Sequence, residues 1–302
     1  CLYFILKSLN LKKGDEVLLT PITIPDIVNA IHVLGLKPVF VEMSLDDQNI
    51  KLNDLDLKLT ANSRVLLITH LCGIVPDMDL ILEKVKSNNL ILIEDISQNY
   101  GAEYAGKLLG TFGVASIGSL SVTKTISSLA GGIILTDDDS IADKVRGFSN
   151  KELRRPRRVF LLDELISQIK IALATSRFIF PLLTYYFLRF VYALAPDKFE
   201  KIQKGISLTK NPSQLSCFQN FPVLRDQMPN EALVWFSDLQ SDIALTTITK
   251  LKTGINKRRK LARVLYDNLK PEVQIFFPEK IRDFTQNIYW QHKARTSHVF
   301  CN

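Results

Sequence analysis

Short apolar segments alternate with amphipathic segments through the first half of the chain, and this alternation restricts the fold more than any other feature. Strands that are apolar along their whole length must be covered on both faces. The pattern therefore predicts an α/β fold, a mostly parallel sheet flanked by helices. Helix-like segments occupy residues 25–35, 77–89 and 140–148. Strand-like runs occupy residues 16–20, 37–43, 63–71, 90–96, 114–121 and 131–137.

The composition is that of a globular chain. Of the 302 residues, 46% are hydrophobic and 23% are charged, which excludes an intrinsically disordered protein. The four cysteines and four histidines are scattered, with no CxxC pair. We therefore expect reduced thiols, no metal site and a cytoplasmic location.

The net charge of +7 is concentrated in two basic clusters, residues 151–158 and 256–263. Such clusters can meet anionic lipid or nucleic acid, but a solvated face is their commonest explanation. A nucleic-acid-binding module is the weakest interpretation, because the clusters lack interleaved aromatic residues and a known reading motif.

One lysine, Lys124, stands among small and apolar residues just after the run 114–121. The ordinary explanation is a strand-end lysine whose stem lets the amine reach water. The alternative is a nucleophilic amine with a lowered pKa. Asp95 follows the apolar part of the run 90–96, and ligands of such sheets bind outside the carboxyl ends of the strands. We therefore expect a carboxylate, hydroxyls and an amine to meet in one crevice.

These groups are the ones that pyridoxal 5′-phosphate (PLP) requires. A lysine must bind the cofactor aldehyde, and a carboxylate must keep the pyridine nitrogen protonated. Hydroxyls and backbone N–H groups must bind the phosphate. Asp95, Lys124 and the serines near the lysine could supply several of these roles.

Four segments in order resemble the DegT/DnrJ/StrS-type sugar aminotransferases. They are residues 14–43, 69–81, 93–113 and 119–138, and the likeness covers residues 1–150 and resumes at 227–232. The resemblance implies the aspartate aminotransferase-like fold, PLP as cofactor, and a homodimer with sites at the subunit interface. It also implies amination of a nucleotide-linked keto-sugar, with glutamate as amino donor, in the synthesis of surface polysaccharides or related glycans.

The resemblance also implies roles for individual residues. Lys124 matches the Schiff-base lysine, which also moves the proton between substrate and cofactor. Asp95 matches the carboxylate that faces the pyridine nitrogen, and Gln98 matches the side chain beside the ring. Ser119 matches the phosphate-binding serine. His70 falls on a family histidine, but a histidine satisfied at a strand end is the favoured explanation.

The sequence departs from the family at several positions. Ile24 stands where an aromatic residue commonly stacks on the cofactor ring, and the turn at 127–132 is altered. Arg225 stands near a family asparagine that reaches the partner subunit's phosphate, and arginine binds phosphate more strongly than an amide. The chain begins at Cys1, after the position of the family's Ser-Gly-Thr loop, so we expect an N-terminally truncated protein.

We expect three domains: residues 1–150 bind the cofactor, 151–212 form a helical insertion, and 213–302 form part of a small C-terminal domain. Lys170, Arg177 and Thr184 continue a seven-residue spacing that starts at Asp163. This spacing predicts one amphipathic helix with a wide apolar face over 159–195, suited to peripheral membrane contact. The alternative is a helical hairpin buried in a dimer interface or against the main core. Farther along, 229–269 reads as one long helix interrupted near Gly254, and 273–279 as a strand.

The primary functional hypothesis is a PLP-dependent aminotransferase. A sugar dehydratase of the same fold is disfavoured, because such relatives carry histidine where this chain has Lys124. The alternative of another class is a catalytically impaired, membrane-tethered scaffold or regulatory protein, which Ile24 and the altered turn favour. Binding of PLP would separate the alternatives.

Overall fold

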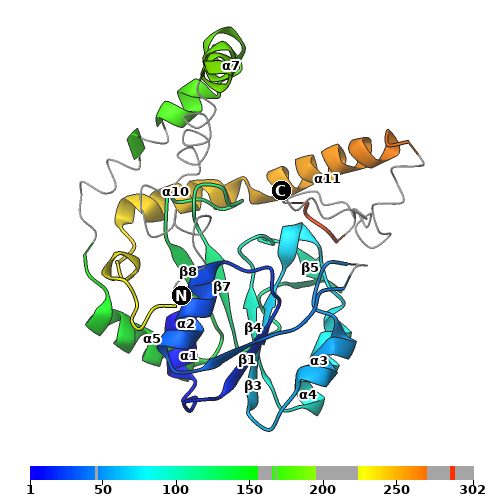
Figure 1. Ribbon diagram of the computed structural model, residues 1–302, viewed down its shortest axis with the longest axis vertical. Helices are drawn as coiled ribbons and strands as arrows, with labels where there is room; N and C mark the ends of the chain where they lie inside the picture. Colours follow the sequence, from blue (N-terminus) through cyan, green and yellow to red (C-terminus); the bar gives the residue numbers. More distant parts are fainter. Residues whose placement is uncertain (45–46, 156–164, 167–168, 195–223, 271–285, 290–302) are drawn as a thin grey trace. The chain divides into compact units, whose positions relative to one another are not determined.

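The computed structural model describes residues 1–44, 47–155, 165–166, 169–194, 224–270 and 286–289. The chain divides into two compact units. The first unit consists of Cys1–Leu153 with Arg225–Asn302 and contains the central sheet, and the second consists of Arg154–Leu224 (Figure 1).

Six strands form one sheet in the order β2-β1-β3-β4-β7-β8. The first five are parallel, and β8 pairs antiparallel with β7. Each strand lies within one of the apolar runs, which confirms the predicted α/β fold with a mostly parallel sheet. The strands are β1 (Glu16–Leu19), β2 (Lys37–Phe40), β3 (Ser63–Thr69), β4 (Ile91–Asp95), β7 (Ala115–Ser119) and β8 (Gly132–Leu135).

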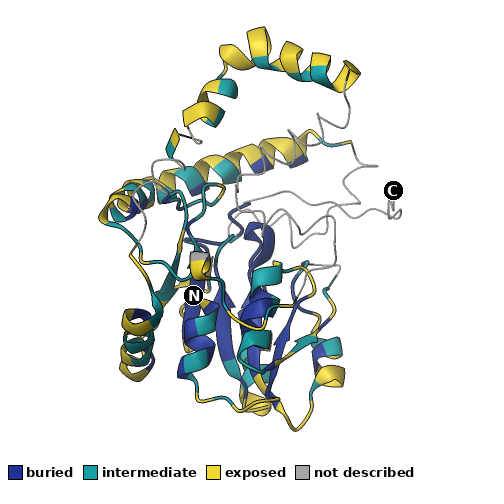
Figure 2. Cartoon of the chain, turned by 60° about the vertical axis from the view of Figure 1, so that its left-hand side comes forward, coloured by how far each residue is buried: buried dark blue, intermediate teal, exposed yellow. Residues whose placement is uncertain are grey.

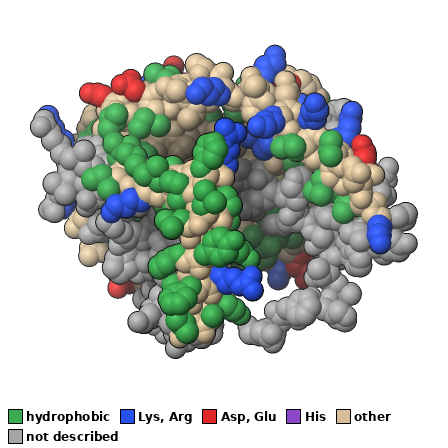
Figure 3. Space-filling view, turned by 90° about the horizontal axis from the view of Figure 1, so that it is seen from above, with side chains coloured by type: hydrophobic (Ala, Val, Ile, Leu, Met, Phe, Trp, Pro, Cys, Tyr) green, Lys and Arg blue, Asp and Glu red, His purple; other side chains and the backbone are tan. Residues whose placement is uncertain are grey.

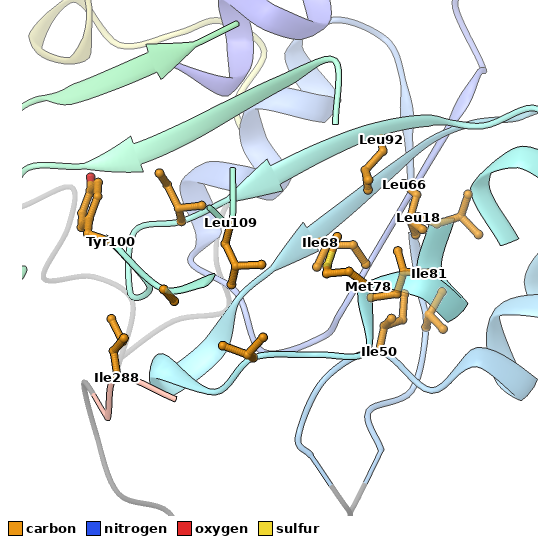
Figure 4. Close-up of a cluster of buried hydrophobic side chains, with 14 of the residues drawn as sticks. Leu18, Ile50, Leu66, Ile68, Met78, Ile81, Leu92, Tyr100, Leu109 and Ile288 are labelled. Carbon is orange, nitrogen blue, oxygen red and sulfur yellow. The ribbon is translucent and has the colours of Figure 1, made fainter. Parts of the chain in front are cut away.

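Helices cover both faces of this sheet because successive side chains of a strand point to opposite faces. In β1, Val17 and Leu19 pack with α1 (Leu2–Ser8) and α2 (Pro25–Val33). Leu18 packs on the other face with α3 (Leu52–Lys58) and α4 (Met78–Ser87). Figure 4 shows this second cluster, with Leu66 and Met78 among its members. The buried residues accordingly concentrate on the strands (Figure 2).

Helix α5 (Asp139–Glu152) follows β8 and is attached to α1 by polar contacts. Its Glu152 accepts hydrogen bonds from Tyr3 at 3.1 Å and from Lys7 at 2.5 Å. Asp138 caps its N-terminus by accepting from the Ile141 N–H. These contacts hold the end of the first 150 residues against their beginning.

Two small elements have no counterpart among the sequence predictions. Helix α3 has one buried residue, Leu55, so it has little apolar periodicity to reveal it. A two-stranded hairpin, β5 (Glu103–Tyr104) with β6 (Lys107–Leu108), is too short for an alternating pattern. It turns on Ala105 and Gly106, both at positive φ.

The long helix expected over 229–269 is wrong in two respects. A 3₁₀ turn, η4 (Asn230–Ala232), precedes α10 (Asp238–Thr249), whose N-cap Ser237 forms a capping box with Gln240. The interruption falls at Lys250, and α11 (Leu251–Asp267) runs through Gly254. The expected strand at 273–279 lies outside the described residues.

Tertiary contacts explain why the bend falls at Lys250 and why this region joins the first unit. Thr247 exchanges hydrogen bonds with the backbone of Ser127. Leu251 and Ile255 approach Gly101 so closely that a Cβ there would lie 3.0 and 2.9 Å from them. Each of the two helices thus has its own contact with the first 150 residues. Arg225–Asn302 belong to the same compact unit as Cys1–Leu153, and the division into three domains stays a prediction.

The single amphipathic helix expected over 159–195 is also wrong where the structure describes it. Residues 169–174 are helical, 175–178 form a turn, and the helix resumes at 179. Ser176 lies in this turn, and its hydroxyl accepts from the Ile179 N–H, at the start of the second part, at 3.1 Å. A π-helix, η2 (Phe180–Thr184), contains Pro181 and leads into α7 (Tyr185–Leu194). The seven-residue polar spacing therefore does not follow one helix.

We predict that Leu66→Ala, in the middle of β3, lowers the free energy of unfolding by about 2–5 kcal/mol. Leu66 is 0% exposed and its side chain is enclosed by the cluster in Figure 4. Urea denaturation measures the change. Leu57→Ala is the control, because Leu57 is 82% exposed and its truncation is expected to cost less than about 0.5 kcal/mol. Equal losses in the two variants would contradict the assignment of the core.

Candidate active site

Asp95 is the last residue of β4 and lies at the carboxyl edge of the sheet, 8% exposed. It is on the face of α1 and α2, because Ile93, two residues earlier, packs in that cluster. Its Oδ1 accepts a hydrogen bond from the Ser97 N–H at 2.9 Å. The backbone turn that follows β4 therefore holds this carboxylate in one orientation.

Lys124 lies in the loop between β7 and β8 and is partly buried. Its backbone N–H donates to the Ser121 carbonyl at 3.0 Å, which makes a tight turn after the strand. The carboxyl ends of β4 and β7 are neighbours in the sheet, so the loop brings the lysine towards Asp95. The sequence prediction that these two residues share a strand-end crevice agrees with this geometry.

The two groups act on each other electrostatically. Burial lowers the pKa of the Lys124 amine, and the Asp95 charge opposes part of that shift. Burial raises the pKa of Asp95, against the hydrogen bonds from Ser97 and the positive charge of Lys124. A larger share of the lysine is consequently neutral than for a lysine in water. A neutral amine is the form that attacks a carbonyl carbon.

Ser119 ends β7 and is fixed by three contacts. Its N–H donates to Ser97 Oγ at 2.9 Å, and its carbonyl accepts from Tyr100 Oη at 2.9 Å. Its hydroxyl accepts weakly from the Ser121 N–H at 3.4 Å. The structure thus links the ends of β4 and β7 through Ser97 and Ser119.

Tyr100 is a site-supporting residue that the sequence reasoning missed. It lies across the backbone of β7, where a Cβ on Gly118 would come 2.2 Å from Tyr100 Oη. Burial, with the nearby Asp95 charge, raises the pKa of its phenol well above the usual range, so it stays a donor to Ser119. The glycine in the middle of an otherwise apolar strand was the available signal.

Gln98, which the resemblance places beside a cofactor ring, contacts the loop after β3 in the structure. Its Oε1 accepts from the Cys72 N–H at 2.7 Å. Cys72 has a left-handed backbone, with φ of 61°, in the short turn η1 (Leu71–Gly73) after β3. Gln98 therefore stabilises the loop at the end of the adjacent strand, and its contact with a cofactor stays a prediction.

Glu94, which the sequence reasoning did not single out, is the most heavily bonded carboxylate of this region. It accepts from the N–H groups of Gly110, Phe112 and Gly113 at 2.7–2.8 Å. His70 Nε2 lies 2.9 Å from it, and both side chains are 0% exposed. Burial alone would raise the pKa of Glu94, but these hydrogen bonds outweigh burial and hold it below the usual value. His70 is thus a histidine satisfied at a strand end on one nitrogen, while its buried Nδ1 has no hydrogen-bond partner in the described part of the chain.

Arg225 contacts the N-terminal part of α2. The Arg225 guanidinium pairs with Asp26 at 2.9 Å, and the Arg225 backbone N–H donates to Asn29 Oδ1 at 2.8 Å. Ile24, the N-cap of α2, is 61% exposed. The structure therefore brings Asp95, Ser119 and Lys124 together, whereas Arg225 belongs to a contact group centred on α2, and its phosphate role stays a prediction.

The first 167 residues match the model of the DegT/DnrJ/EryC1/StrS aminotransferase family. The chain belongs to this family. A GDP-perosamine synthase of Escherichia coli O157:H7 is 35% identical over 152 residues, which are 50% of this chain and 42% of that protein. The chain thus spans less than half the length of this curated relative.

Solved structures show the same fold. An aminotransferase from Psychrobacter cryohalolentis superposes with a TM-score of 0.64 and 19% identity, covering 96% of this chain and 61% of that one. A GDP-4-keto-6-deoxymannose-3-dehydratase with a trapped PLP-glutamate geminal diamine gives a TM-score of 0.59 and 21% identity, covering 88% and 58%. These likenesses confirm the PLP-transferase fold class expected for this family member.

We predict that Glu94→Gln destabilises the fold by about 3 kcal/mol or more, because it leaves buried groups around His70 without their charged partner. The free energy of unfolding by urea measures this loss. Glu42→Gln is the matched control: Glu42 forms an exposed ion pair with Lys51 at 2.9 Å, and such pairs contribute about 0–1 kcal/mol. A loss at Glu94 no larger than at Glu42 would contradict the role given to this carboxylate.

We predict that Asp95→Asn lowers the pKa of Lys124 further, because the Asp95 charge is what opposes the effect of burial. The neutral amine then forms at lower pH, so an amine-specific reagent labels Lys124 at lower pH than in the parent chain. Peptide mass spectrometry across a pH series measures this. Asp143→Asn, which removes an exposed carboxylate on α5 paired with Arg146, should leave the labelling curve unchanged. A curve shifted to higher pH in Asp95→Asn would refute the coupling.

Proposed function

We propose that this family member is a PLP-dependent aminotransferase that converts a nucleotide-linked keto-sugar into an amino-sugar. The observation that carries the proposal is the electrostatic coupling of Lys124 and Asp95 at neighbouring strand ends. A solvated surface lysine would have neither the burial nor the buried carboxylate beside it. The family match supports the same chemistry.

The described residues fit the cofactor. Lys124 supplies an amine with a lowered pKa, and Asp95 supplies an oriented carboxylate. Ser97, Ser119 and Ser121 supply hydroxyls at the carboxyl edge of the sheet, where anionic groups bind in such folds. When bound, PLP would act as an electron sink that stabilises a carbanion on the amino-acid or sugar substrate.

The protein groups then have separate tasks. Asp95, held in one orientation by Ser97, would keep the pyridine nitrogen of the cofactor protonated. Lys124 would hold the cofactor through its amine and, as a neutral amine, would accept and return the proton of the substrate carbon. Tyr100 holds the Ser119 backbone so that its hydroxyl stays at the strand end. Glutamate would donate the amino group in a first half-reaction, and the keto-sugar would receive it in a second. Two successive half-reactions of this kind give ping-pong kinetics.

The substrate class and assembly are parts of the same proposal. A relative named GDP-perosamine synthase favours a GDP-linked sugar among nucleotide-sugars. The family likeness favours a homodimer with sites at its interface, working in the cytoplasm for glycan synthesis. Contact with the inner face of a membrane would involve residues of the second unit and is independent of this reaction.

Cofactor binding is the first test. After incubation with PLP, the full chain should show a visible absorption band, and borohydride reduction should fix the cofactor mass on the peptide containing Lys124. Lys124→Ala should show neither. Lys58→Ala, which removes an exposed lysine of α3, should keep both.

Two outcomes would overturn the proposal. Labelling of a lysine other than Lys124 would refute the site. No band and no labelling in the full chain would favour the scaffold or regulatory alternative. If the band appears, a screen of GDP-linked keto-sugars with glutamate tests the substrate class, and turnover without a nucleotide-sugar would refute it.

A further inference from the structure

The second unit carries a large exposed apolar surface that the chemistry at Lys124 does not use. We call residues 169–194 the apolar segment, and all of them lie beyond the family match, which ends at residue 167.

 

The large side chains of the apolar segment are exposed, and Figure 3 shows hydrophobic side chains crowded together on the face that it draws. The most exposed are Phe178, Leu182, Leu183, Tyr186, Phe190 and Leu194, at 63–77%.

Helix α7 has one charged residue, Arg189, and its other residues are apolar or aromatic. Its partly covered residues, Leu188 and Val191, continue a single line from Thr184, and the rest of the helix surface is exposed. Apolar side chains that are exposed together to this extent normally mark a surface that contacts a partner or lipid. We therefore expect this surface to be covered by another molecule or by lipid rather than exposed to water.

The helices of the apolar segment are too short to cross a bilayer. The helical run 179–194, which includes η2 and α7, has 16 residues and is about 24 Å long at most, against about 30 Å of hydrocarbon. Among the described residues, no helix is long and apolar enough to span a membrane. The turn at 175–178 separates this run from the helical residues 169–174, and short helices of this kind suit a surface lying along an interface.

The charges of the apolar segment have one sign. Lys170, Arg177 and Arg189 are its charged residues, and it contains no Asp or Glu. From residue 151 to 194, Lys and Arg outnumber Asp and Glu by eight to three. The Arg177 guanidinium lies 4.7 Å from the centre of the Phe178 ring, and Arg189 donates to Tyr185 Oη at 3.2 Å. The basic groups thus stay beside apolar side chains, where they can reach anionic headgroups.

A second copy of the chain fits this surface less well. A symmetric contact would place the same patch on itself and bring basic side chains of both copies together without acidic partners. Tyrosine, in contrast, is enriched where a membrane meets water, and Tyr185, Tyr186 and Tyr192 are exposed on α7.

We propose that the apolar segment docks on the surface of a bilayer containing anionic lipid. Its leucine, phenylalanine and tyrosine side chains enter the headgroup region, while Lys170, Arg177 and Arg189 contact lipid phosphates. This docking does not rest on the reaction proposed for Lys124.

Vesicle flotation with the full chain tests the proposal. Binding should be strong on phosphatidylcholine vesicles that contain phosphatidylglycerol, weak on phosphatidylcholine alone, and reduced by salt. Leu182→Asp/Phe190→Asp should weaken binding by about tenfold or more, since it puts charge on the apolar surface. Leu57→Asp/Leu245→Asp, at residues 82% and 60% exposed elsewhere, should bind as the parent chain does.

A second pair of variants tests the charges. Arg177→Gln/Arg189→Gln should weaken binding to the anionic vesicles by about fivefold for each residue at low salt. Lys58→Gln/Arg146→Gln, which removes two exposed basic groups of the first unit, should bind as the parent chain does. All four variants should unfold at the same urea concentration as the parent chain, which shows that they are folded without any reliance on PLP binding.

Three results would overturn docking on lipid. One is the absence of binding to anionic vesicles by the folded parent chain. Another is binding that Leu182→Asp/Phe190→Asp leaves unchanged. The third is a parent dimer, seen by sedimentation, that this double variant dissociates without any change in vesicle binding, because the surface would then be an interface between copies.

Discussion

The site depends on two adjacent carboxylates at the end of β4. Glu94 and Asp95 are consecutive, so the pleat of the strand points them to opposite faces of the sheet. Glu94 is fully bonded to His70 and to three backbone N–H groups of the loop 110–113. Asp95 accepts from Ser97 and faces the charge of Lys124. Glu94 therefore stabilises the structure, and Asp95 is the carboxylate to which we assign the contact with the cofactor.

This division explains how a loop residue such as Lys124 can be positioned. The ends of β4 and β7 beside it are fixed on one face of the sheet, by the hydrogen bonds of Glu94 and by Tyr100 across the backbone of β7. Gly118 makes the second contact possible, because any side chain there would collide with the tyrosine. A site held by buried hydrogen bonds in this way needs little reorganisation when charge moves within it.

Much of the fold could be predicted because the inner strands β1, β3, β4 and β7 are mostly buried and appear in the sequence as apolar runs. The position of Asp95 and Lys124 at the carboxyl edge of the sheet could be predicted for the same reason, since a polar residue just after such a run marks that edge. Glu94 could not, because an apolar run does not show which face each residue takes. The bend at Lys250 was missed because contacts with Gly101 and Ser127 fix it, and local sequence does not encode those contacts.

Apolar segments of similar hydropathy are buried in the first unit and exposed in the second. The strands of the sheet are apolar because helices cover them, and Leu66 is 0% exposed. Helix α7 is as apolar, yet Leu194 at its end is 69% exposed. Hydropathy cannot separate these cases, but exposure together with charge can. A covered strand has no need of nearby charge, whereas an uncovered helix with only basic residues among its apolar ones has a surface complementary to an anionic lipid layer.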